Sequence, residues 1–187
     1  MKNMNLPNKL TLLRVCMIPV FMIFALIENG FCQFIAVALF LLASLTDYLD
    51  GYIARSCNLV TDFGKFMDPI ADKLLVMSAM VVLTAQGRMP DWACILMLAR
   101  EFLVSGFRLV AVENGRVIAA GPLGKLKTVF QMISTIALML LVPVEGDALL
   151  GPVGVTLANV LMYIALALTV VSGADYLIRN KDCIKDM

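Results

Sequence analysis

Four aspartates in the first half of the chain are spaced as a metal site would require. They belong to an ordered set of polar and small residues: Asp47, Asp50, Gly51, Ala54, Arg55, Gly64, Asp68 and Asp72. On a helix the first four members of this set share one face, because steps of three and four residues return to the same side. The last two aspartates share a face for the same reason. Two helices presenting these faces to each other would form an all-oxygen pocket, which suits Mg²⁺ or Mn²⁺.

These carboxylates stand in strongly apolar sequence. Charged groups near a bilayer are costly, so we expect them to be paired, metal-bound or next to a wet cavity. The alternative is that acidic residues merely end helices at the membrane interface. That alternative explains one or two of the aspartates, but not four at helical spacing. Gly51 and Ala54 add no bulk between the acids, which leaves room for a flat group to approach the backbone.

The composition predicts that these helices lie in a membrane. Of the 187 residues, 61% are hydrophobic and only 16% are charged, too few to cover the surface of a soluble domain. A spanning helix needs about 20 mainly apolar residues. The apolar runs predict six spans, at approximately 10–28, 33–54, 68–86, 91–113, 124–143 and 153–177. The first run is long for a signal peptide and no cleavage site follows it, so we expect it to be retained.

The connections between the spans are short, so we expect one membrane domain over residues 1–187. The predicted fold is an all-α integral membrane protein, with six transmembrane helices around a cytoplasm-facing polar cavity. Orientation follows from the basic residues, which mark the cytoplasmic side. All 15 Lys and Arg residues except Arg88 and Arg100 flank that side: Lys2, Lys9, Arg14, Arg55, Lys65, Lys73, Arg108, Arg116, Lys125, Lys127, Arg179, Lys181 and Lys185. Both termini and the aspartates should therefore face the cytoplasm.

A second constellation is cationic. Arg100 and Arg108 lie in the fourth predicted span, and Lys125 and Lys127 open the fifth. Arg presents a planar fork that suits phosphate, and Lys adds a point charge. Two alternatives stay open: the lysines are ordinary cytoplasmic anchors, and Arg100 pairs with Glu101 inside the membrane. The chain contains no histidine, so catalysis would depend on carboxylates, Lys, Arg or hydroxyls.

The acidic pattern, D-x2-D-G-x2-A-R-x8-G-x3-D-x3-D, resembles the signature of the CDP-alcohol phosphotransferases, and every fixed position is filled. Three other stretches, at 6–14 with Pro19, 99–108 and 124–131, resemble the subfamily whose acceptor is sn-glycerol 3-phosphate. The resemblance extends over approximately residues 5–178. It implies an enzyme of phospholipid biosynthesis that transfers a phosphatidyl group from CDP-diacylglycerol to sn-glycerol 3-phosphate and releases CMP.

The resemblance also implies roles for individual residues. Two ions, Mg²⁺ or Mn²⁺, would be held by Asp47, Asp50, Asp68 and Asp72, and Asp72 would also be the catalytic base. The nucleotide would be bound by Gly51, Ala54, Arg55, Asn8, Thr11 and Arg14. For Asn8 and Thr11, helix capping after Pro7 is an alternative role. The phosphate of the acceptor would be bound by Arg100, Arg108, Lys125 and Lys127. The resemblance further suggests a homodimer in the cell membrane (the inner or plasma membrane).

Three rival functions remain open. Within the family, another phosphorylated polyol such as inositol phosphate could be the acceptor. Intramembrane prenyltransferases also use Asp-rich Mg²⁺ motifs, but with different spacing. A membrane cation transporter would use buried acids too, although we would expect those near the middle of the membrane on several helices, whereas these aspartates gather at one edge.

Overall fold

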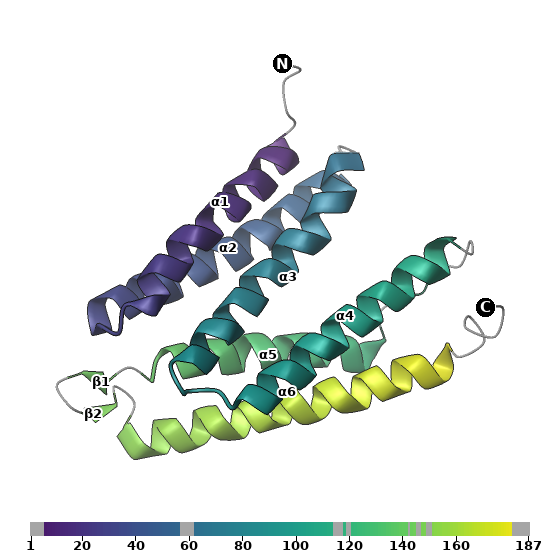
Figure 1. Cartoon of the computed structure of the whole chain (residues 1–187). Helices are drawn as coiled ribbons and strands as arrows, with labels where there is room; N and C mark the ends of the chain where they lie inside the picture. The colour runs from purple at the N-terminus through teal and green to yellow at the C-terminus, as the bar shows by residue number, and fades with distance from the viewer. Residues whose placement is uncertain are drawn as a thin grey trace. The chain divides into compact units, whose positions relative to one another are not determined.

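Six helices make up nearly all of the described chain. The computed structural model describes residues 6–56, 62–113, 118, 121–141, 143–144, 147–148 and 151–180. The helices are α1 (Leu6–Leu26), α2 (Gly30–Ser56), α3 (Asp62–Ala85), α4 (Asp91–Glu113), α5 (Pro122–Met139) and α6 (Gly151–Arg179) (Figure 1). Each of them overlaps one of the six predicted helices, so the predicted helical fold is confirmed for this part of the chain.

The all-α prediction holds for the described residues, which depart from it only in a short pair of strands after α5. The fifth helix was expected to reach residue 143, but it ends at Met139. Strand β1 (Pro143–Val144) then pairs antiparallel with β2 (Asp147–Ala148), in the register Pro143↔Ala148 and Val144↔Asp147. Proline lacks a backbone N–H and disfavours the helical region for the residue before it, so Pro143 weighs against a longer α5. It is not an absolute bar, since Pro19 and Pro69 lie inside α1 and α3.

Three helical segments among the described residues are long and apolar enough to cross a bilayer: Asn8–Leu26, Gly30–Asp47 and Gly151–Arg179. Their outward faces carry large apolar side chains such as Ile23, Leu42 and Val171, all exposed. In a lipid environment these side chains need no cover from protein. Charged residues interrupt the apolar sequence of α3 and α4.

The chain divides into two compact units. Unit 1 comprises Met1–Gln86 with Met139–Leu149, and unit 2 comprises Gly87–Leu138 with Leu150–Met187. In unit 1, α1 packs along both α2 and α3 (Figure 1). Phe21 of α1 meets Phe40 of α2 with ring centroids 5.9 Å apart, and buried alanines of α2 let the helices approach closely.

In unit 2, α4 and α6 run side by side in the same direction (Figure 1). Two aromatic pairs join them, one near the start of α4 and one closer to its end. Trp92 stacks on Tyr163 at a centroid distance of 6.3 Å, and Phe107 meets the edge of Tyr176 at 5.8 Å. Such pairs add about 0.5–1.5 kcal/mol each beyond the area they bury. They set the register of α4, which carries Arg100 and Arg108, against α6, which carries Ser172.

Gln33 of α2 caps the end of α1. Its side-chain amide is buried and donates to the carbonyl oxygens of Ala25 at 2.7 Å and Ile27 at 3.3 Å. The last carbonyls of a helix have no partner within the helix, so they need donors from elsewhere. Gln86, which directly follows α3, also donates to the Ala25 oxygen, at 2.7 Å. The C-terminus of α1 is thus fastened to both of its neighbours in unit 1.

Replacing Gln33 with leucine should destabilise unit 1, because it removes one of the two side-chain donors to the Ala25 oxygen and leaves only Gln86. The expected loss is about 0.5–1.5 kcal/mol of the free energy of unfolding, seen as a lower Tm in detergent. Phe34→Leu, at an exposed neighbouring position, is the control and should melt like the wild type. An unchanged Tm for Gln33→Leu would show that this cap does not hold α1.

Candidate active site

A polar face on the first helix is the centre of the acidic site in unit 1. Asn8, Thr11 and Arg14 follow one another at intervals of three residues, so they share one side of α1. Thr11 is 1% exposed and Arg14 is fully buried. A guanidinium buried among apolar helices is stable only when a counter-charge meets it.

That counter-charge comes from α2. Arg14 Nη1 donates to Asp47 Oδ1 at 2.6 Å in an ion pair. On the same face of α1, Thr11 Oγ1 donates to Asp68 Oδ1 of α3, also at 2.6 Å. The first helix therefore brings together two of the four predicted acids, one from each neighbouring helix.

The other two acids are placed less completely. Asp72 lies one turn after Asp68 on α3, and its side chain is exposed. The positions of Asp50, Gly51, Ala54 and Arg55 fall within helix α2, but their side chains lie outside the described part of the chain. Among the side chains that are described, no group of three or more His, Cys, Asp or Glu residues could hold a metal ion.

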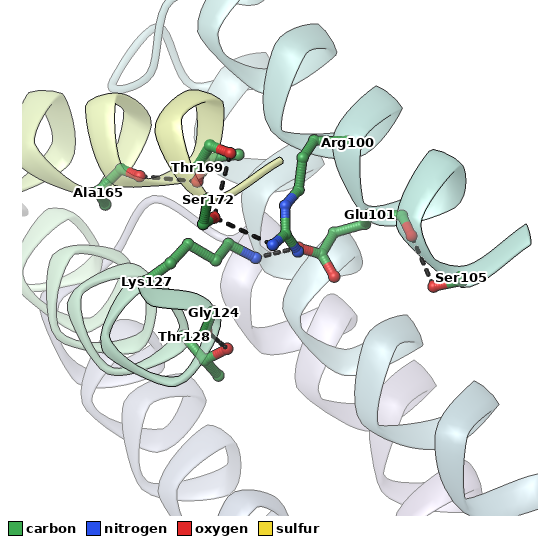
Figure 2. Close-up of polar contacts among 9 residues, drawn as sticks. All are labelled: Arg100, Glu101, Ser105, Gly124, Lys127, Thr128, Ala165, Thr169 and Ser172. Atoms are coloured by element: carbon green, nitrogen blue, oxygen red, sulfur yellow. Dashed lines mark hydrogen bonds and ion pairs between the residues drawn. The ribbon is translucent and has the colours of Figure 1, made fainter. Parts of the chain in front are cut away.

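Two of the cationic residues of unit 2 bind one carboxylate, in what we call the Glu101 cluster: Arg100, Glu101, Lys127 and Ser172 (Figure 2). Lys127 Nζ of α5 and Arg100 Nη1 of α4 both donate to Glu101 Oε1, the latter at 3.3 Å. Arg100 Nη2 donates to Ser172 Oγ of α6 at 3.0 Å. The sequence had left open that Arg100 pairs with Glu101, and the structure contains this ion pair. Lys127 forms a second ion pair with the same carboxylate.

Two residues of α6 were not predicted to take part. Ser172 accepts from Arg100 and donates onward to the carbonyl oxygen of Thr169 at 3.3 Å. A Cβ atom at Gly173 would lie 3.0 Å from Arg100 Cγ, so a side chain there would force the arginine stem to shift by a few tenths of an ångström. Nothing in the spacing of Ser172 and Gly173 marks them in the sequence, because serine and glycine are common at packed membrane helices.

The remaining two predicted cations differ from these in their surroundings. Arg108, two turns after Glu101 on α4, and Lys125 in the first turn of α5 are exposed. By contrast, the side chain of Lys127 is 3% exposed. The structure thus joins Arg100 and Lys127 through Glu101, and it leaves Arg108 and Lys125 on exposed faces of their helices.

The chain matches the family model described as CDP-alcohol phosphatidyltransferase over residues 4–171. A CDP-diacylglycerol–glycerol-3-phosphate 3-phosphatidyltransferase of Bacillus subtilis is 43% identical, and the match covers 97% of this chain and 97% of the relative. A protein of the same name from Rickettsia typhi is 42% identical, over 92% of this chain and 94% of the relative. A probable phosphatidylglycerophosphate synthase of Mycobacterium tuberculosis is also 42% identical, over 94% of this chain and 81% of its own length.

The family match covers the acidic residues of unit 1 and three members of the Glu101 cluster. The fourth member, Ser172, lies one residue beyond the end of the match. The resemblance expected from the spacing of the aspartates is confirmed. The chain belongs to the CDP-alcohol phosphatidyltransferase family.

Proposed function

We propose that this protein transfers the phosphatidyl group of CDP-diacylglycerol to sn-glycerol 3-phosphate, giving phosphatidylglycerophosphate and CMP. The observation that carries the proposal is the likeness to relatives named for this reaction, which extends along 97% of the chain in one case and 92% in another. The chain carries acids in unit 1 and cations in unit 2, and both kinds of residue suit the chemistry. The acids can hold metal ions against a diphosphate, and the cations can bind an acceptor that already carries a phosphate.

We treat the whole chain, residues 1–187, as one catalytic membrane domain, because the family match runs through both compact units. The proposed topology has six spans with both termini and the active site on the cytoplasmic side. It is supported by the one-sided distribution of Lys and Arg. That side is also where the water-soluble acceptor is available. The cytoplasm-facing cavity and a homodimer stay predictions.

Members of this family generally depend on a divalent metal. We propose two ions, Mg²⁺ or Mn²⁺, held by Asp47, Asp50, Asp68 and Asp72. The described carboxylates fit this, since Asp47 and Asp68 are both bonded to one face of α1 and carboxylate oxygens are the ligands these hard cations prefer. When bound, the ions would neutralise the diphosphate and stabilise the departing CMP.

The residues of the chain then have separate tasks in the transfer. The acceptor hydroxyl attacks the phosphorus that carries diacylglycerol, a P–O bond forms, and the P–O bond to CMP breaks with its electrons leaving on CMP. Asp72 accepts the proton of the attacking hydroxyl. Its exposed position on α3 suits a base that must reach a substrate.

For the nucleotide we propose Gly51, Ala54 and Arg55 of α2 together with Asn8, Thr11 and Arg14 of α1. The contacts of Thr11 and Arg14 give these two residues a further task. By donating to Asp68 and Asp47, they orient the carboxylates for metal binding. Mutation of a group that orients a metal ligand typically lowers the affinity for the metal by about 10–100-fold.

For the phosphate of the acceptor we propose Arg100, Arg108, Lys125 and Lys127. Arg108 and Lys125 are exposed and can meet a solute directly. Arg100 and Lys127 are already compensated by Glu101, but a lysine has three N–H donors and an arginine five. Each can therefore donate to a phosphate oxygen without releasing Glu101.

The function is tested by CMP release from CDP-diacylglycerol by purified protein in detergent with Mg²⁺. The acceptors to compare are sn-glycerol 3-phosphate, inositol phosphate and serine. We expect release with sn-glycerol 3-phosphate and none in excess EDTA, because the carboxylates alone cannot neutralise the diphosphate. Release with inositol phosphate but not with sn-glycerol 3-phosphate would overturn the acceptor, and full activity in EDTA would overturn the metal chemistry.

The role of Asp72 as the base has its own test. Asp72→Asn should lower kcat by about 10²–10⁴-fold, the usual contribution of a positioned base, and additional Mg²⁺ should not restore it. Asp91→Asn, at an exposed aspartate that begins α4, is the matched control and should keep normal activity. Recovery of Asp72→Asn at high Mg²⁺ would instead make Asp72 a metal ligand only.

A further inference from the structure

We propose that Glu101 is a positioning residue, which holds Lys127 and Arg100 at a fixed separation so that together they bind the phosphate of the acceptor. This inference rests on the proposed function. It adds Glu101, an acidic residue, to the cations proposed to bind the acceptor. A search for phosphate ligands would exclude Glu101, because a carboxylate repels phosphate.

The first argument is geometric. Lys127 Nζ and Arg100 Nη1 donate to the same atom, Glu101 Oε1 (Figure 2). Two nitrogens in contact with one oxygen cannot move apart independently. Lysine has a flexible four-carbon stem, so without such an anchor its ammonium group would occupy many positions. One carboxylate oxygen therefore sets the spacing of two cations that come from different helices.

The second argument is electrostatic. Lys127 and Arg100 are 3% and 15% exposed, so water compensates their charges poorly. Two buried cations next to each other would repel, and removing the partner of a buried charge is strongly unfavourable. Glu101 cancels one of the two charges. The cluster keeps one net positive charge, which favours an anionic ligand.

The third argument concerns the other side of Arg100. Ser172 Oγ accepts from Arg100 Nη2 at 3.0 Å, and the missing side chain at Gly173 leaves room for the arginine stem. The guanidinium is thus oriented from α6 as well as by Glu101. A planar fork held on two sides loses little freedom when a phosphate binds, which is what a positioned binding group requires.

The test compares Glu101→Gln with Lys127→Met and with the double variant, measuring the KM for each substrate. Glu101→Gln should raise the KM for sn-glycerol 3-phosphate by roughly tenfold or more, the cost of a charge-assisted hydrogen bond. The KM for CDP-diacylglycerol should stay within about twofold of the wild-type value. In the Lys127→Met background the same change should have a much smaller effect, because Glu101 then has one cation fewer to position.

The control is Asp175→Asn, which removes a carboxylate from the 2.6 Å ion pair of Asp175 with Arg179 on α6 and should change neither KM. If Glu101→Gln does not fold, Glu101→Asp serves for the same comparison, since it keeps the charge and moves the oxygen by one methylene group. A normal acceptor KM in a folded Glu101 variant, or a loss shared equally by both substrates, would overturn the inference. If Lys127→Met also leaves the acceptor KM unchanged, the proposed acceptor site itself has failed.

Discussion

The acidic site depends on one constraint: each carboxylate in an apolar setting must be given a partner. Helix α1 meets this constraint with a cation and a hydroxyl group on a single face. Arg14 neutralises Asp47 and Thr11 donates to Asp68, so the acids of α2 and α3 both take their orientation from α1. The packing of α1 along both helices is therefore a requirement of the chemistry as well as of the fold.

Unit 2 solves the opposite problem with the same kind of interaction. There one carboxylate, Glu101, lies between two cations, and α6 completes the arrangement through Ser172. Each unit thus stabilises charges in an apolar setting by placing one group of opposite sign between or beside them. In the proposed reaction the acids of unit 1 serve the diphosphate, and the cations of unit 2 serve the phosphate of the acceptor.

Much of the fold could be predicted from the sequence, because long apolar runs separated by polar connections leave few alternatives. The span expected at 91–113 coincides with α4, Asp91–Glu113. The expectation failed at the end of α5, where the apolar run continues to Pro143 but the helix stops at Met139. An apolar run predicts which residues can lie in lipid. It does not predict where the helix ends, because that depends on backbone hydrogen bonds.

The candidate site was predictable in its residue types but not in its pairings. Four aspartates and four cations stand out in the sequence, because placing charged residues in an apolar segment is energetically unfavourable. Their hydrogen-bond partners cannot be recognised in this way, since Thr11 and Asp68 are 57 positions apart and Arg100 and Ser172 are 72 apart. Pairings over such separations follow from how helices pack, which no local pattern records. Thr11 and Arg14 were expected to contact the nucleotide, and only the structure indicates that they also orient the acids.

The most direct test of this account is the Mg²⁺ concentration that gives half-maximal CMP release in two variants of Thr11. Thr11→Ser keeps the hydroxyl that donates to Asp68, and Thr11→Val keeps the shape but removes the donor. If α1 orients the metal-binding carboxylates, the valine variant should need about 10–100-fold more Mg²⁺, while the serine variant should behave like the wild type. A valine variant with the wild-type Mg²⁺ requirement would contradict the account.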